Sequence, residues 1–111
     1  MQTVVETAEF IRAIKTIGLT QALYDELIAL FAAEPDAGEP MSGTGGFRKV
    51  RFARPGMGKR SGCRVISFYS GVHIPVFLIT VFAKNEKVNL SKAEQNALNA
   101  TGKQIVTEYE K

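Results

Sequence analysis

Residues 47–53 read FRKVRFA, and residues 63–70 read CRVISFYS. Both runs are rich in aromatic and β-branched residues, which favour strands, and the loop of residues 54–62 between them contains glycine, proline and basic residues. This arrangement predicts a β-hairpin. A third run, VFLITVFA at residues 76–83, follows a turn at Gly71. It is apolar along most of its length, which indicates a strand buried on both faces in the centre of the sheet.

Two helical patterns precede these strands. After a short β-prone run at residues 2–6 (QTVVE), Thr7 is expected to cap a helix that Gly18 ends. Thr20 is expected to open a second helix, which ends before Pro35. Apolar residues recur at helical spacing in both segments, so each helix has one side that can pack on a sheet.

The rest of the chain supplies a connection and a last helix. Residues 35–46 contain two prolines and four glycines and are expected to form a turn-rich connection. Residues 91–94 (SKAE) match a capping box that opens a C-terminal helix, which Gly102 is expected to weaken. The order β-α-α-β-β-β-α predicts an α+β fold, with a mainly antiparallel sheet and helices packed on one face.

Composition limits the class of protein. The 111 residues, of which 45% are hydrophobic, suffice for a single domain over residues 1–111. Cys63 is the only cysteine, which excludes an intramolecular disulfide, and Glu6 and Glu9 stand where an export signal would carry basic residues. The longest apolar run, residues 74–83, is about half of what a membrane-spanning helix needs. These features predict a cytoplasmic protein without a membrane partner.

The net charge of +3 conceals an uneven distribution. Residues 41–85 contain eight basic residues and no acidic one, whereas the rest of the chain has six basic and eleven acidic residues. Such a block indicates a positive field directed at a polyanion, and we expect that polyanion to be RNA. An ordinary solvated basic surface is the alternative. The basic residues of the block are Arg48, Lys49, Arg51, Arg54, Lys59, Arg60, Arg64 and Lys84.

The strand pattern gathers part of this charge on one side. Alternation puts Val50 and Phe52 on the face that is expected to meet the helices, so Lys49 and Arg51 point away from the core. These two cations stand about 7 Å apart, close to the spacing of successive phosphates in an extended strand of nucleic acid. Arg64 opens the neighbouring strand, so the basic residues converge on one end of the hairpin.

Motifs of other chemistries are incomplete. Residues 58–61 (GKRS) resemble part of a phosphate-binding P-loop, but Arg60 stands where Ser or Thr must follow the lysine, which argues against a nucleoside triphosphate site. Cys63 is expected to be a small buried residue and His73, the only histidine, a solvated turn residue, so neither is assigned a role. Lysine and arginine can cleave RNA without a metal if they take the 2′-hydroxyl proton, stabilise the phosphorane and protonate the 5′-oxygen.

Three blocks of the sequence resemble one known family. They read GTGGFRKVR at residues 43–51, GKRSGCRVI at residues 58–66, and FAKNE at residues 82–86, ahead of Leu90 and Ser91. In this order they resemble the toxins of bacterial type II toxin–antitoxin pairs, in the HigB-like branch of the RelE superfamily. The resemblance covers roughly residues 43–98, and the expected element order agrees with the RelE-like fold.

The resemblance implies a ribosome-dependent mRNA endonuclease that uses no cofactor and is silenced by a cognate antitoxin of the helix-turn-helix type. Asn85 stands where some relatives have arginine. Tyr69 is the candidate substitute for a tyrosine that the best-known members carry before the final helix. Matched by position, the catalytic residues are Lys49, Arg51, Arg64 and Lys84. The expected RNA-binding residues are Arg48, Arg54, Lys59, Arg60, Tyr69 and Asn85.

Two other classes of function stay open on the sequence. The first is a toxin without nuclease activity, like the ParE branch of the same superfamily, which inhibits DNA gyrase; the set of Lys49, Arg51 and Arg64 favours cleavage over this alternative. The second is a simple nucleic-acid-binding module. It lacks support, because the sequence has no recognisable reading helix, RNP-like aromatic motif or zinc site.

Overall fold

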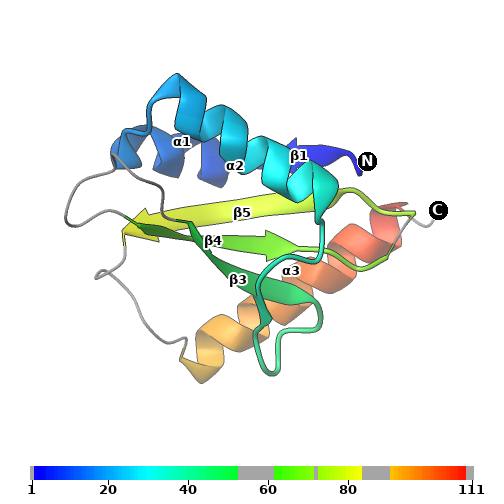
Figure 1. Cartoon of the computed structure of the whole chain (residues 1–111). Coiled ribbons are helices and arrows are strands. Elements are labelled where there is room, and N and C mark those ends of the chain that lie inside the picture. Colours follow the sequence, from blue (N-terminus) through cyan, green and yellow to red (C-terminus); the bar gives the residue numbers. More distant parts are fainter. Residues whose placement is uncertain (1, 53–61, 72, 84–90, 110–111) are drawn as a thin grey trace.

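The described strands form one five-stranded sheet in the order β1-β5-β4-β3-β2. Figure 1 labels four of these strands, β1, β5, β4 and β3. The computed structural model describes residues 2–52, 62–71, 73–83 and 91–109. Neighbouring strands run antiparallel except for β1 and β5, which are parallel. The predicted α+β fold with a mainly antiparallel sheet is confirmed. The elements are β1 (Val4–Glu6), α1 (Ala8–Ile17), α2 (Gln21–Ala33), β2 (Glu39–Pro40), β3 (Phe47–Phe52), β4 (Cys63–Phe68), β5 (Val76–Ala83) and α3 (Lys92–Tyr109).

The first two helices begin and end where local chemistry directs. The hydroxyl of Thr7 accepts a hydrogen bond from the backbone N–H of Phe10 at 3.2 Å, and Thr20 accepts one from Leu23 at 3.2 Å. Each bond satisfies an N–H group that has no partner within the helix. Gly18 ends α1 in the left-handed conformation, at φ 76°, which glycine adopts without strain. These bounds agree with those predicted from the sequence.

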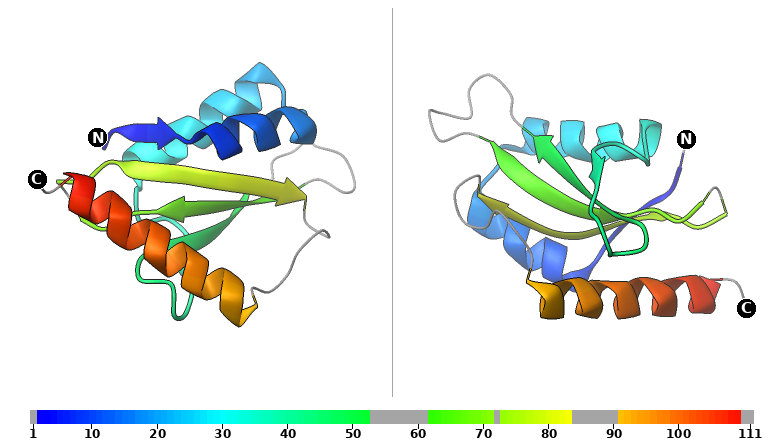
Figure 2. Two further views of the ribbon diagram at one scale, coloured as in Figure 1. Left: turned by 180° about the vertical axis from the view of Figure 1, so that it is seen from behind. Right: turned by 90° about the horizontal axis from the view of Figure 1, so that it is seen from below.

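The helices lie on both faces of the sheet (Figure 2). Helices α1 and α2 cover one face, where Phe10 and Phe31 pack against Val50 and Val65 of the strands. Helix α3 covers the other face, where its apolar residues pack against a second cluster around Phe47. The prediction that the helices share one face is therefore wrong for α3. The physical reason is that the strands carry large apolar side chains on both faces, and each face requires a cover.

Helix α3 runs through Gly102 without interruption. A Cβ atom at this position would lie 2.8 Å from Cε1 of Phe68 and 3.1 Å from Cε1 of Phe47. The glycine, which was expected to weaken the helix, is therefore the residue that lets α3 approach the sheet. Tyr109, near the end of α3, meets the ring of Phe77 edge-on, with centroids 5.4 Å apart.

Two smaller differences from the predicted order concern strand ends. The connection of residues 35–46 contains β2, which pairs with β3 and adds a fifth strand. Strand β4 ends at Phe68, two residues earlier than expected, so Tyr69 lies outside the strand. Strand β5 occupies the interior position that was predicted for it, between β1 and β4. Among the described residues, no helix has the length and apolar character that crossing a membrane requires.

Candidate functional site

The pairing register places Arg51 of β3 directly opposite Arg64 of β4, and Arg64 directly opposite Phe82 of β5. Directly opposed residues in an antiparallel sheet share a face, with Cβ atoms about 5 Å apart. All three lie on the face that α3 packs against, because the buried Phe47 is on that face of β3 and alternates with Arg51. We call Arg51, Arg64 and Phe82 the arginine row.

In the arginine row, two positive charges lie directly opposite one another. Arg51 is exposed, Arg64 is half-buried, and no described residue forms an ion pair with either guanidinium. Like charges directly opposite one another destabilise a sheet. Two arginines in this relation are therefore better explained by an anion that binds both than by folding, and phosphate oxygens suit the planar donor fork of arginine.

Helix α3 leaves the arginine row uncovered. Its contacts at Gly102 and Tyr109 all fall on one row across the sheet, formed by Phe47, Phe68 and Phe77. Arg51 is four residue steps along β3 from Phe47 of that row, which corresponds to about 13 Å. A helix with its side chains has a radius of only about 5 to 6 Å. The sheet face is thus apolar where α3 crosses it and cationic beyond the helix.

Lys49 lies on the same face, one row nearer to α3. Its Cα partners are Ile66 of β4 and Glu39 of β2. Lys49 is half-buried and stands about 7 Å from Arg51 along the strand. Glu39 comes from outside the acid-free block of residues 41–85, so the fold brings a negative charge beside the positive surface that the sequence predicts.

This arrangement can bind two adjacent groups of a nucleic-acid backbone. The two arginines, whose Cβ atoms are about 5 Å apart, provide several N–H donors, which suits a phosphate whose negative charge increases during a reaction. Lys49 provides a third cation two residue pairs along the strand, on the same face. Within the described ranges, no group of three or more His, Cys, Asp or Glu residues could hold a metal ion.

The comparison with known families bears on the same residues. The model of the family described as the RelE toxin of the RelE/RelB toxin–antitoxin system matches residues 3–111. The chain belongs to the RelE toxin family. The match includes every element of the fold, and so extends beyond residues 43–98, where the sequence blocks first suggested the resemblance.

The described part of this RelE-family chain does not include all the predicted site residues. It brings Arg51 and Arg64 together and places Lys49 beside them. The predictions for five further site residues stand on the sequence alone, because these residues lie outside the described part of the chain. These are Arg54, Lys59, Arg60 and Lys84, together with Asn85.

Arg48 and Tyr69, two further predicted RNA-binding residues, are not brought to the arginine row. Arg48 is the Cα partner of Ser67 on the face of α1 and α2, and its Nε atom is buried without a hydrogen-bond partner among the described residues. Tyr69 packs against the core on that same side. It is five residues from Arg64 along β4, or about 17 Å. This geometry does not support Tyr69 as the substitute for the tyrosine of other family members.

Cys63 and His73 have the environments that the sequence predicted. Cys63 is 1% exposed, and burial raises the pKa of its thiol, with a smaller opposing effect of Arg64. A buried, protonated thiol is a poor nucleophile. His73 is exposed in a turn, on the side of the sheet where β5 begins and Arg64 is distant.

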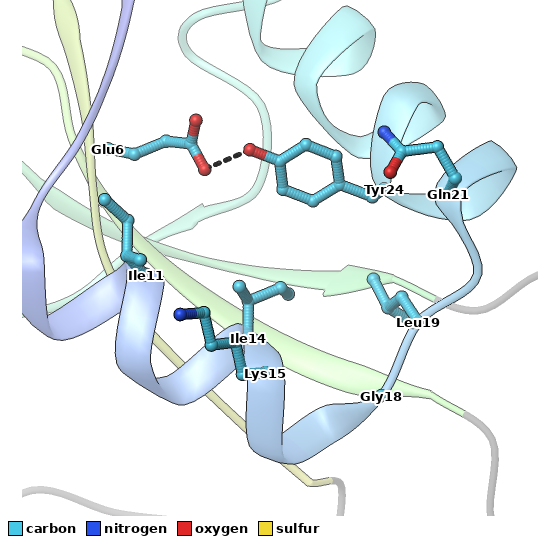
Figure 3. Close-up of a pocket in the computed structure, with 8 residues that line it drawn as sticks. All are labelled: Glu6, Ile11, Ile14, Lys15, Gly18, Leu19, Gln21 and Tyr24. Carbon is cyan, nitrogen blue, oxygen red and sulfur yellow. Dashed lines mark hydrogen bonds between the residues drawn. The ribbon is translucent and has the colours of Figure 1, made fainter.

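A pocket of about 490 Å³ opens between α1 and α2, on the face opposite the arginine row (Figure 3). The hydroxyl of Tyr24 donates a hydrogen bond to the carboxylate of Glu6 across this pocket. Burial, and then the bond to Glu6, raise the pKa of Tyr24 to about 12, so the hydroxyl stays protonated as a donor. Lys15 is the one basic residue of the lining, so the pocket lacks the paired cations that distinguish the arginine row.

Phe82 is the member of the arginine row that the sequence did not assign. The sequence predicts its strand, but the face depends on a bulge: Ile66 pairs with Thr80 and Ser67 with Leu78, so one residue of β5 is skipped. Simple alternation would put Phe77 and Phe82 on opposite faces, whereas both pack on the cluster under α3.

Proposed function

We propose that this chain is a ribosome-dependent mRNA endonuclease of the HigB-like branch of its family. It acts in the cytoplasm and is held inactive by a cognate antitoxin of the helix-turn-helix type. The observation that supports cleavage most directly is that Arg51 and Arg64 lie directly opposite one another and that neither forms an ion pair with a described residue.

The proposed reaction needs a group that takes a proton, cations that stabilise the phosphorane, and a group that gives a proton. The 2′-oxygen of the RNA attacks the adjacent phosphorus, and a basic group takes its proton. The bond from phosphorus to the 5′-oxygen of the next nucleotide breaks, and that oxygen receives a proton. The products are a 2′,3′-cyclic phosphate and a 5′-hydroxyl. In this proposal Arg64, with Arg51, stabilises the charge that accumulates on the phosphorane oxygens, and Lys49, two residue pairs along the strand, takes part in proton transfer.

The test measures single-turnover cleavage of mRNA bound to ribosomes by the full chain and its variants. Loss of one donor to a developing oxyanion typically costs about 10²- to 10³-fold in rate, and we expect this loss for Arg64→Ala. Arg64→Lys should recover little, because lysine cannot reproduce the planar fork. Circular dichroism establishes first that each variant is folded.

Two substitutions serve as matched controls. Arg12→Ala removes the same charge from α1, where Arg12 is exposed and pairs with Glu9 at 2.8 Å. His73→Ala changes an exposed turn residue. Both should cleave at the wild-type rate. Full activity in folded Arg64→Ala would refute the proposed site. Growth arrest with intact messages and accumulating gyrase complexes would instead favour a ParE-like inhibitor.

A further inference from the structure

Phe82 differs from the other phenylalanines of the α3 face. Phe47 and Phe68 are completely buried and Phe77 is 7% exposed, which agrees with their position under α3. Phe82 packs against the same apolar cluster but is only half-buried. Its ring is therefore supported by the core on one side, while part of its surface remains accessible beyond the helix.

The accessible ring lies next to the proposed phosphate site. Phe82 and Arg64 are direct Cα partners on neighbouring strands, with the two strands about 4.8 Å apart. In RNA, one ribose joins a base to its phosphate. A nucleotide whose phosphate contacts Arg64 can therefore extend its base across the sheet to the adjacent strand, which is β5.

We propose that Phe82 is a stacking platform for one unpaired RNA base whose phosphate is held by Arg51 and Arg64. The inference rests on the proposed function, since it assumes that the arginines bind RNA. An aromatic face accepts every base, because each base has a π-face, so Phe82 binds the nucleotide without reading its sequence. It positions the substrate and takes no part in proton transfer.

A purely structural role for Phe82 makes a different prediction. If the ring only fills the apolar cluster, its removal lowers the stability of the protein and weakens the binding of every RNA by the same factor. If the ring stacks on a base, its removal weakens the binding of only those RNAs that carry a base at the contacted position. A comparison of normal and abasic RNA separates the two roles.

The experiment measures binding of the full chain to a seven-nucleotide single-stranded RNA at low salt, by fluorescence anisotropy. Seven further RNAs each carry one abasic position. For wild type we expect one abasic position to weaken binding about tenfold, the size of a typical base–aromatic contact. In Phe82→Leu, the ratio of the dissociation constants of that abasic RNA and the normal RNA should fall to about one. Phe82→Tyr, which keeps the ring, should retain the wild-type ratio. Phe77→Leu is the matched control from the same cluster, and its ratio should equal that of wild type.

Each outcome decides between the proposals. An unchanged abasic ratio in folded Phe82→Leu, or no binding of any RNA by the wild-type chain, would overturn the stacking role. Arg64→Ala tests the proposed function separately and should weaken the binding of the normal and the abasic RNAs by the same factor. If Arg64→Ala weakens both while Phe82→Leu leaves the ratio intact, only the stacking inference fails. If Arg64→Ala weakens neither, the arginine row is not an RNA site.

Discussion

Replacing Gly102 by alanine tests whether α3 packs on the sheet as closely as the structure requires. In an exposed helix, Gly→Ala stabilises by about 1 kcal/mol. Here the added Cβ would lie 2.8 Å from Cε1 of Phe68 and 3.1 Å from Cε1 of Phe47, and both rings are completely buried. Overpacking of this kind costs about 1 to 3 kcal/mol. We therefore expect a net loss of about 1 kcal/mol, or about 4 °C in Tm.

Urea unfolding followed by circular dichroism measures this change. Ala100→Gly, at an exposed position of α3, calibrates the helix propensity and should destabilise by about 1 kcal/mol. In a Phe68→Leu background the closest ring atom is gone, so Gly102→Ala should cost less than in wild type. A stabilisation of about 1 kcal/mol by Gly102→Ala in the wild-type chain would refute the close packing. It would also contradict the position of α3 on the sheet from which we infer that this helix leaves the arginine row uncovered.

Two other residues give predictions that concern stability and reactivity. Burial and Glu6 raise the pKa of Tyr24 from 10.0 to about 12, so its contribution to stability is complete below about pH 10 and is lost as the pH rises towards 12. Tyr24→Phe should reduce this alkaline loss in urea unfolding curves, and an unchanged pH dependence would contradict the assignment. Cys63 is 1% exposed with a raised pKa, so iodoacetamide should modify it only when the chain unfolds, whereas rapid labelling of the native protein would show that β4 opens locally.

The parts of the fold that were predictable from the sequence depend on local chemistry. Thr7 and Thr20 each cap a helix through a hydroxyl that reaches an N–H three residues ahead, and this requires no knowledge of the tertiary structure. Strand β5 was predictable in the same way, because a long apolar run between turns has few alternatives. Gly102 was misjudged for the opposite reason, since its role depends on rings more than thirty residues away in the sequence.

The candidate site was predictable only in part, because it depends on strand register. Alternation within β3 correctly puts Lys49 and Arg51 on one face, and strand order brings Arg64 to the same end of the hairpin. That Arg64 lies directly opposite Arg51, and not one pair away, follows from the register and the loop between the strands. The position of Glu39 beside Lys49 likewise depends on β2, a strand of two residues that the sequence did not predict.

The division of one sheet face into an apolar half and a cationic half explains how a small domain tolerates this site. Like charges that lie directly opposite one another, as Arg51 and Arg64 do, destabilise a sheet, so they must lie where few core contacts depend on them. The three buried phenylalanines of the α3 face, Phe47, Phe68 and Phe77, form one row about 13 Å from the arginines, and the buried Ile66 lies between that row and Arg64. The bulge in β5 then brings Phe82 onto the cationic half as its one large apolar side chain among the described residues. A ring placed there contributes less to the core than Phe47 or Phe68, and this is why we assign it a role in binding the substrate.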